Sequence, residues 1–427
     1  MRKRNVGSAA AAIAVIAVAA LSGCGSGEED KVTEVEILQY KPEAAAYFDQ
    51  VESAFNASHN DIRLTISSPN DASTIMRTRF IREDYPDIIG IGGDINYSYY
   101  VDAGILADMS DYEGLADISQ SYVDILDALE IVPTDGTYGI PYAANAAGIL
   151  YNQDLFEEHG WEIPETWTEL LDLCGEIQAD GIQPFYFGFR DVWTCLAPWN
   201  ALAVGLTPSD TCQRVNAGET TFAQEYRETA EKCMKLLEYG PEDPFAYGYN
   251  DACTAFANGQ SAMYPIGSYA VPQILSVNPD MNINSFVMPA NENPEDNTLN
   301  SGVDLLFAVT EKCGNKEAAY EVISFLLEDE NLQEYISAQN AISCKKGDFQ
   351  LAPELEGMQT FIEAGKMADF QDHYYPSEMA ADALIQTFLI NKDVDGFLND
   401  FDRRWQRYNR DIIRKVQEYN EEHGTDE

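Results

Sequence analysis

The chain has 427 residues, enough for two or three lobes around a large buried core. Its composition of 45% hydrophobic residues, with 24 tyrosines, 19 phenylalanines and 5 tryptophans, indicates a folded protein rather than a disordered acidic chain. Lysine and arginine number 26 against 72 acidic residues, which gives a formal net charge of −46. Phosphate backbones and anionic membrane surfaces repel such a molecule, so nucleic acid is excluded as a partner.

The N-terminal segment has the layout of a bacterial export signal. Three basic residues at positions 2–4 precede an apolar run from Ala9 to Leu21, shorter than the about 20 residues that span a bilayer. The run ends in Leu21-Ser22-Gly23-Cys24, which resembles the lipobox of bacterial lipoproteins. That resemblance implies cleavage before Cys24 and a lipid on its sulfur, whereas an ordinary secretory signal is the alternative. We therefore expect a signal peptide over residues 1–23 and a lipidated cysteine with its tether over residues 24–31.

Seven cysteines follow Cys24, at positions 174, 195, 212, 233, 253, 313 and 344. An odd number at wide spacing cannot form a closed disulfide framework. No Cys-x-x-Cys pair occurs and the chain has four histidines, so we expect no zinc site. Most of these cysteines are expected to be buried free thiols, and a Cys195–Cys212 bridge is left open.

Hydrophobic patterning along the chain alternates short strands with helices. Strands are predicted over residues 32–38, 62–66, 86–90, 138–145, 149–151, 181–187, 262–266, 286–289 and 305–309. Helices are predicted from Pro42, over 74–82, 164–179, 224–239 and 251–259, and almost without interruption over 316–419. The polar segment 207–221 predicts a loop. Strands separated by ten to fifteen helical residues indicate an α/β fold with parallel strands covered by helices.

Two segments resemble ligand motifs but fit them poorly. Gly90-Ile91-Gly92-Gly93 follows a strand but lacks the third glycine of a dinucleotide loop, so a tight strand exit is favoured over phosphate binding. Oxygen-bearing residues in the segment 391–402 match the offsets of a calcium loop, although its last position is Asp402 rather than the usual glutamate. A polar turn between two helices is the favoured interpretation, and calcium binding is left open.

No catalytic motif stands out, since neither Gly-x-Ser-x-Gly nor His-Glu-x-x-His occurs. This favours a binding protein over an enzyme. A glycosidase remains the main alternative, because its two carboxylates, about 5–9 Å apart, leave no sequence signature.

Aromatic and amide residues gather beside the short loops that follow predicted strands. Aromatic rings stack on the apolar faces of sugars, while Asp and Asn bind sugar hydroxyls. The strand ends of an open α/β sheet are where such sheets bind ligands. The residues concerned are Tyr40, Asp94, Tyr97, Tyr99, Tyr142, Asn145, Trp193, Trp199, Asn200, Tyr269 and Asp304.

Several longer segments resemble the extracellular solute-binding proteins of carbohydrate ABC transporters, of the maltose- and oligosaccharide-binding type. They are Tyr138–Gly160 (YGIPYAANAAGILYNQDLFEEHG) with Pro164–Leu171 (PETWTELL), Ala255–Tyr264 (AFANGQSAMY) with Gly267–Tyr269, Lys316–Leu326 (KEAAYEVISFL), and Asp84–Asp87 with Gly104–Asp108. Together with the lipobox, they extend over essentially the whole chain.

The resemblance implies two α/β lobes joined by three hinge strands, with the ligand in the cleft between them. Lobe one is expected over residues 32–142 and 291–340, lobe two over 146–288 and 344–419, and a frayed tail over 420–427. It also implies a binding site. Tyr269 stands where the family usually has a sugar-stacking tryptophan, and the remaining expected ligand-binding residues are Tyr40, Asp94, Tyr97, Asn145, Trp193, Trp199 and Asp304.

The expected function is that of a membrane-anchored receptor on the extracytoplasmic face. It would bind a sugar or oligosaccharide and deliver it to an ABC permease, as a monomer and without cofactor, catalytic residues or metal. A polyamine-like cation is the alternative ligand, because aromatic rings with Asp94 and Asp304 would also make a cation box. Anionic ligands fit poorly, since Arg190 is the one arginine in the expected loops.

Overall fold

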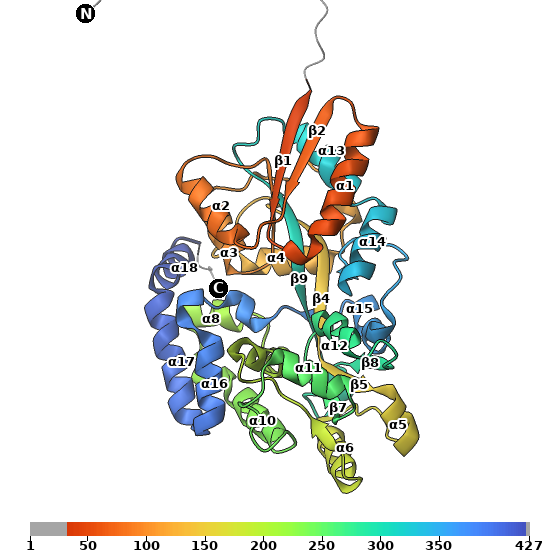
Figure 1. The fold of residues 1–427 in the computed structure, drawn as a ribbon. Helices are drawn as coiled ribbons and strands as arrows, with labels where there is room; N and C mark the ends of the chain where they lie inside the picture. Colours follow the sequence, from red (N-terminus) through yellow and green to blue (C-terminus); the bar gives the residue numbers. More distant parts are fainter. Residues whose placement is uncertain (1–31, 424–427) are drawn as a thin grey trace, which may run out of the picture.

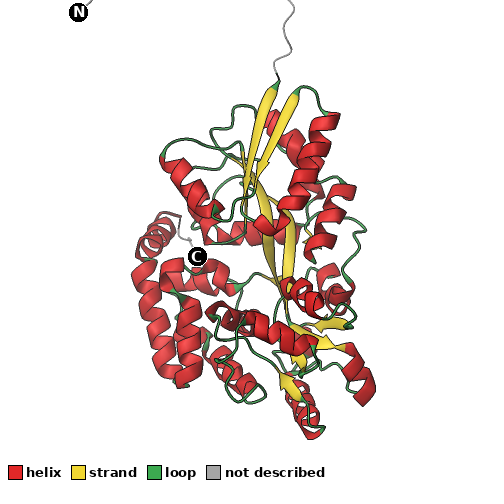
Figure 2. Cartoon of the chain, viewed as in Figure 1, coloured by secondary structure: helices red, strands yellow, loops and turns green. Residues whose placement is uncertain are grey.

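The structure is a computed structural model that describes residues 32–423, and its strands form two separate sheets (Figures 1 and 2). The larger sheet has the order β10-β4-β9-β3-β1-β2, with β11 paired to β9 outside this path. The smaller sheet has the order β6-β7-β5-β8. The strands are β1 (Thr33–Gln39), β2 (Ile62–Ser67), β3 (Ile88–Ile91), β4 (Ile140–Ala147), β5 (Ile149–Asn152), β6 (Gln183–Phe185), β7 (Ser261–Tyr264), β8 (Ile283–Phe286), β9 (Leu299–Val309), β10 (Ile342–Ser343) and β11 (Met367–Ala368).

Helices surround each sheet and divide the molecule into two lobes, the upper and lower halves of Figure 1. Lobe one has α1 (Ala45–Ser58), α2 (Ala72–Ile81), α3 (Ile95–Asp102), α4 (Gln120–Leu129), α13 (Lys316–Leu326) and α14 (Asp329–Gln339). Lobe two has α5 (Gln153–His159), α6 (Trp167–Ala179), α7 (Leu196–Leu206), α8 (Thr211–Ala217), α9 (Phe222–Glu225), α10 (Arg227–Leu237), α11 (Tyr249–Ala257), α12 (Val271–Val277), α15 (Gln359–Glu363), α16 (Ala381–Asn391), α17 (Val394–Tyr408) and α18 (Arg410–His423). The predicted α/β class and two-lobed architecture, with a helical C-terminal region, are confirmed.

Local sequence explains these elements well. In β2 buried and exposed residues alternate, so one face of the strand packs on the core while the other meets solvent. Helix α6 begins with a capping box in which Thr166 accepts from the backbone N–H of Glu169 and the Glu169 side chain accepts from that of Thr166. Strand β1 is parallel to β2 and β3, as the alternating pattern predicted, whereas β9 runs antiparallel to both β3 and β4.

Strands β4 and β9 form the backbone connection between the lobes. They pair antiparallel over most of their length, with Asn145 opposite Gly302, and both extend between the upper and the lower lobe in Figure 1. At the lower end, Ala147 of β4 makes a bridge to Gly267, which precedes a 3-10 turn of lobe two (Ser268–Ala270). The residues along this pair are therefore placed where the two lobes meet.

Three predictions about local structure are wrong. The segment 207–221 is not a loop, because Thr211, Cys212 and Val215 are buried together on α8 and the left-handed Gly218 ends that helix. The strand predicted at 286–289 lies three residues earlier, as β8. The region after Lys316 is not continuously helical, because β10, β11 and a 3-10 helix at Gln371–Tyr374 interrupt it. These elements are short and lie between segments with helical periodicity, so the sequence pattern did not reveal them.

The seven cysteines of the described chain are free, six of them buried and Cys313 half-buried. No Cys195–Cys212 bridge forms. Burial raises the pKa of the Cys195 and Cys212 thiols, which therefore behave as small hydrophobes. Cys24, the proposed signal peptide and the tether lie outside the described residues.

The expected polar turn between two helices is confined to Lys392 and Asp393, because α16 ends at Asn391 and α17 begins at Val394. Asp393 caps α17 by accepting from the backbone N–H of Gly396, and the residues that follow are helical. Asp402 accepts from the backbone N–H groups of Phe222 and Ala223 at 2.8 and 3.2 Å. These carboxylates are thus occupied in two separate helix caps.

Within residues 32–423, no helix combines the length and the apolar character needed to cross a bilayer.

Candidate functional site

A cleft opens where the two lobes meet, and two of its pockets share Asn145 and Tyr269. The first has a volume of about 430 Å³ and is bounded by Lys41, Glu43 and Asp304 of lobe one and by Tyr249, Tyr269 and Gln273 of lobe two. The second has a volume of about 300 Å³, and Trp193, Asn200, Asp372 and His373 line it. Both lobes therefore supply walls of the same cleft.

Three aromatic side chains form one wall of the cleft, which we call the aromatic wall: Trp193, Tyr249 and Tyr269. The Trp193 ring lies 5.0 Å from that of Tyr249 and 6.1 Å from that of Tyr269, centroid to centroid. Trp193 remains 40% exposed although it lies in a short 3-10 helix (Val192–Cys195) packed against α16. An exposed ring held among other rings offers a face on which an apolar ligand surface can stack.

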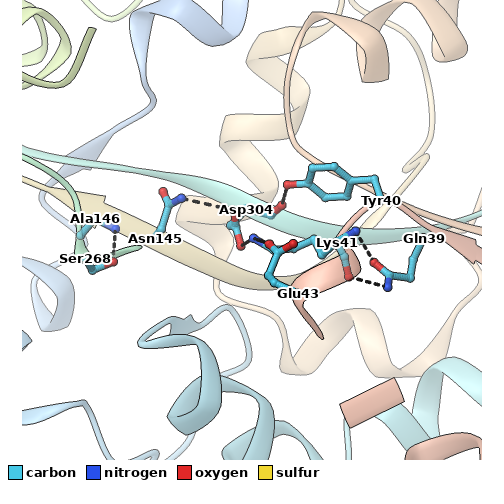
Figure 3. A network of polar contacts seen from close by, with 8 residues as sticks. All are labelled: Gln39, Tyr40, Lys41, Glu43, Asn145, Ala146, Ser268 and Asp304. Atoms are coloured by element: carbon cyan, nitrogen blue, oxygen red, sulfur yellow. Dashed lines mark hydrogen bonds and ion pairs between the residues drawn. The ribbon is translucent and has the colours of Figure 1, made fainter. Parts of the chain in front are cut away.

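The opposite wall is polar and is centred on Asp304 (Figure 3). Its carboxylate lies 2.5 Å from the Lys41 ammonium, the hydroxyl of Tyr40 donates to its backbone oxygen, and Asn145 Nδ2 donates to its Oδ1 at 3.3 Å. Burial opposes the charge of Lys41, but Asp304 and Glu43 raise its pKa overall, so it stays protonated. Asn145 Oδ1 is buried without a hydrogen-bond donor and is free to accept one from a ligand hydroxyl.

A charged cluster lies at the far end of the second pocket. His373 Nδ1 is 2.8 Å from Asp369 Oδ1, and Asn200 Nδ2 donates to Asp372 Oδ1 at 2.6 Å. Burial raises the pKa of both aspartates. Burial alone would lower the pKa of His373, but the carboxylates of Asp369, Asp372 and Asp94 raise it to about 10. His373 is therefore an imidazolium at neutral pH.

Asp372 and His373 also line a third pocket, which has a volume of about 500 Å³. Arg77, Asp94 and Tyr99 line its lobe-one side. Asp94 caps α3, because its Oδ1 accepts from the backbone N–H of Asn96 at 2.8 Å. The three pockets thus follow one another along the interlobe cleft through shared residues. Together, the three connected pockets have room for more than one sugar ring.

Comparison with known proteins identifies the architecture. A family model described as "Bacterial extracellular solute-binding protein" matches residues 39–333. The chain belongs to this family. It is a binding-protein family, so this solute-binding protein is not an enzyme, and the glycosidase alternative is set aside.

Among its relatives is the "Multiple sugar-binding protein" of Streptococcus mutans, 28% identical over 340 residues that span 76% of this chain and 78% of the relative. Among solved structures, RafE from Streptococcus pneumoniae in its apo form matches with a TM-score of 0.77 and 21% identity, over 93% of this chain and all of that one. RafE in complex with raffinose matches with a TM-score of 0.73 and 22% identity over 90% of this chain. These structural matches establish the fold.

Five of the eight residues expected in the site line the three pockets of this solute-binding protein: Asp94, Asn145, Trp193, Tyr269 and Asp304. Tyr40 lies behind the cleft wall, where it holds the backbone of Asp304. Among the further residues noted, Tyr99 lines the third pocket, Asn200 holds Asp372, and Tyr142 is buried against Tyr47.

Tyr97 and Trp199 are corrected, because both belong to the hydrophobic core. Tyr97 is 1% exposed on the inner face of α3, and Trp199 is fully buried on α7. Trp199 packs edge-on against Tyr226 and its indole N–H donates to the Tyr375 hydroxyl at 3.3 Å. Neither ring lines a cleft pocket, so we leave both out of the proposed site.

Lys41, Tyr249, Asp372 and His373 were missed by sequence reasoning. A weak signal existed for the last two, because Asp369-Phe-Gln-Asp-His-Tyr-Tyr-Pro376 combines charge with aromatic residues and contains one of four histidines. Lys41 stands directly between Tyr40 and a helix-starting proline and gave no such signal.

Proposed function

We propose that this solute-binding protein is a receptor that takes up a neutral sugar or oligosaccharide in the interlobe cleft and delivers it to an ABC permease. The observation that carries the proposal is the pairing of an aromatic wall with a polar wall across one cleft. Rings stack on the apolar face of a pyranose, while Asn145 and Asp304 face its hydroxyls. The relative named as a multiple sugar-binding protein supports the same ligand class.

Closure of the lobes supplies the mechanism. Trp193, Tyr249 and Tyr269 belong to lobe two, and Lys41 and Asp304 to lobe one, so a sugar between them contacts both lobes only when they approach. A ligand that contacts both lobes stabilises the closed state by its differential affinity for that state. The permease would then distinguish loaded from empty receptors by the closed shape.

The lobe boundaries remain a proposal, with lobe one over 32–142 and 291–340 and lobe two over 146–288 and 344–419. The segment just before β9 contacts lobe two, so we propose that lobe one resumes near residue 300 rather than at residue 291. The backbone N–H of Trp167 donates to the carbonyl of Asn291 at 2.9 Å, and Asn297 Nδ2 donates to the carbonyl of Glu165 at 2.8 Å. These contacts favour a crossing between about residues 300 and 304, next to Asn145 on β4.

We further propose that residues 1–23 are a cleaved signal peptide and that a diacylglyceryl lipid on Cys24 holds the receptor, as a monomer, on the extracytoplasmic face of the membrane. The order of charged, apolar and small residues before Cys24 supports this. Metabolic labelling with a fatty acid would mark the wild-type protein and leave Cys24→Ser unlabelled. Labelling of the Cys24→Ser variant would refute the anchor.

A cationic solute fits the cleft less well than a neutral one. The cation box requires a free carboxylate beside the rings, but Asp304 already forms an ion pair with Lys41. His373 likewise compensates Asp369 and Asp372. The cleft therefore favours hydroxyls over ammonium groups.

A thermal-shift screen tests the proposal. The panel holds raffinose, stachyose, galactose and chitin oligosaccharides, with putrescine and spermidine as cationic controls. A sugar at a hundred times its Kd stabilises the folded protein by about 2.7 kcal/mol, which is a readily measured rise in melting temperature. A rise with a sugar supports the receptor, whereas a rise that is confined to the polyamines and is lost in Trp193→Ala refutes the ligand class.

A further inference from the structure

A separate pocket of about 460 Å³ lies beside the cleft, between α4 and the segment after it on one side and α8, α17 and α18 on the other. It contains none of the aromatic wall and none of the Asp304 network, and it borders the third cleft pocket through Ile95. In Figure 1 the helices α8, α17 and α18 stand at the side of the lower lobe, near the C-terminus. The sugar site leaves this pocket unused.

The walls of this pocket, which we call the α18 pocket, are mainly apolar. Leu129, Ile131 and Val132 face it from lobe one, and Trp405, Ile412 and Val416 face it from lobe two. Trp405 is 1% exposed, and its indole N–H already donates to Asn216 Oδ1 at 2.8 Å. A largely apolar pocket of this volume holds a small molecule with an apolar or aromatic body.

Two buried side-chain amide atoms at the pocket, one of Asn409 and one of Gln213, have no hydrogen-bond partner within the described structure. Asn409 is 1% exposed, and its Nδ2 has no acceptor. Gln213 uses its Nε2 to donate to the carbonyl of Ala128 at 2.6 Å, but its Oε1 has no donor. An unpaired buried polar group costs about 1–3 kcal/mol, so a ligand that donates a hydrogen bond to Gln213 Oε1 is favoured here.

The charge of the lining is negative and uncompensated. Asp127 and Glu130 line the pocket, and within residues 32–423 neither forms an ion pair with lysine, arginine or histidine. Burial raises the pKa of both carboxyls, because neither has a cation nearby to offset desolvation. Arg214 is occupied, since it pairs with Glu219 at 3.8 Å and Glu225 at 3.4 Å.

We propose that the α18 pocket is a second ligand site, distinct from the sugar cleft, for a small organic cation with an aromatic or apolar body. The ammonium group donates to the free amide oxygen of Gln213 and is attracted by Asp127 and Glu130. The body packs against Trp405 and the aliphatic residues. An anionic ligand is rejected by the same carboxylates.

Because the α18 pocket lies between the lobes, a ligand bound there should affect the affinity for sugar. Its walls come from both lobes, and contacts beside it already join them, namely Gln213 with Ala128 and Lys415 with Asp102. A cation bound there contacts both lobes and favours the closed arrangement. By linkage, the cation and the sugar then raise each other's affinity by the same factor.

Isothermal titration of the purified protein with phenethylamine tests the site, with 2-phenylethanol as the neutral molecule of similar shape. We expect the amine to bind at least tenfold more tightly than the alcohol at pH 7. The double variant Asp127→Asn/Glu130→Gln should weaken amine binding at least tenfold. A matched control, Glu157→Gln/Glu158→Gln on exposed positions of α5, removes the same charge and should change the affinity less than twofold.

Each other outcome overturns part of the proposal. Equal affinity for amine and alcohol refutes a cation site, and equal losses in the two double variants show attraction to the acidic surface alone. The variant Trp193→Ala separates the two sites, because it should leave amine binding unchanged. If Trp193→Ala abolishes amine binding, the amine occupies the sugar cleft and the α18 pocket is not a second site.

Discussion

Trp193 and Trp199 lie six positions apart in the sequence, yet the structure predicts opposite effects when each is replaced. Trp193 is 40% exposed in the cleft, whereas Trp199 is fully buried in the core of lobe two. Trp193→Ala should weaken sugar binding with little effect on stability. Trp199→Phe should lower stability with little effect on sugar binding.

The size of the binding effect follows from exposed area. A tryptophan side chain has roughly 250 Å² of surface, so about 100 Å² of Trp193 is available to a ligand. At about 25 cal/mol per Å², complete coverage is worth about 2.5 kcal/mol, and stacking alone about 1 kcal/mol. Trp193→Ala should therefore raise the Kd by about 5- to 70-fold.

The stability effect of Trp199→Phe has two physical sources. The smaller ring leaves a cavity among Tyr226, Phe397 and Phe401, and the hydroxyl of Tyr375 loses the indole N–H that donates to it at 3.3 Å. Together these should cost about 1–3 kcal/mol of unfolding free energy.

Titration calorimetry with the sugar identified by the thermal-shift panel measures the affinities, and thermal melting measures the stabilities. An unchanged Kd in Trp193→Ala, with an unchanged melting temperature, would refute the aromatic wall. A large loss of affinity in Trp199→Phe at an unchanged melting temperature would show that this ring contacts ligand after all.

Three further predictions concern the charged groups and the thiols. Lys41→Met leaves the carboxylate of Asp304 partly buried and unpaired, which should cost roughly 3 kcal/mol of stability in thermal melts, and Lys41→Met/Asp304→Asn should recover part of it. If the double variant recovers nothing, the pair is not the cause. The raised pKa of His373, about 10 when folded against about 6.5 when unfolded, means that its stabilising contribution is complete below pH 6.5 and lost as the pH rises through 10. Denaturant titrations should show a fall of at most about 1.4 kcal/mol per pH unit over that window, which His373→Gln should flatten, whereas an equal slope in the variant would contradict the assignment. Among the described cysteines, half-buried Cys313 should react first with an aromatic disulfide reagent, and Cys313→Ser should delay labelling until unfolding exposes the buried thiols.

Sequence patterning placed β1 and β2 well because both are short and because buried and exposed residues alternate along β2. Residues 33–39 and 62–67 form strands almost where the pattern placed them, since one face of each strand must be buried. The pattern failed at α8, where polar residues outside the buried Thr211, Cys212 and Val215 hide a helix of only two turns. Short helices with narrow buried stripes carry little periodic signal.

The two misassigned aromatic residues show what sequence position cannot decide. Asp94 and Tyr97 are three residues apart, yet the carboxylate caps α3 at the third pocket while the ring turns into the core. The direction of a helical side chain follows from which face packs on the sheet, and that depends on distant segments. For Trp199 a usable signal existed, because α7 is apolar on nearly all sides and such a helix is usually buried.

Long-range pairing explains why the polar wall was only half predicted. Lys41 and Asp304 are 263 positions apart and meet because β1 and β9 lie on either side of β3 in the same sheet. Asp304 could be proposed from the family resemblance, but its partner required the strand order. That partner changes the chemistry of the cleft, because it converts a free carboxylate into a neutral pair.

This compensation distinguishes the two sites of a chain whose net charge is −46. Such a protein attracts cations everywhere by long-range electrostatics, so selection for a neutral sugar requires that carboxylates in the cleft be paired locally. Lys41 and His373 do this in the first two pockets of the sugar cleft, beside Asp304, Asp369 and Asp372. Asp127 and Glu130 have no such partner among the described residues. The two sites therefore differ in whether a nearby cation pairs with their carboxylates, and not in how many carboxylates they have. Paired carboxylates suit the sugar cleft to hydroxyls, and unpaired ones suit the α18 pocket to an ammonium group.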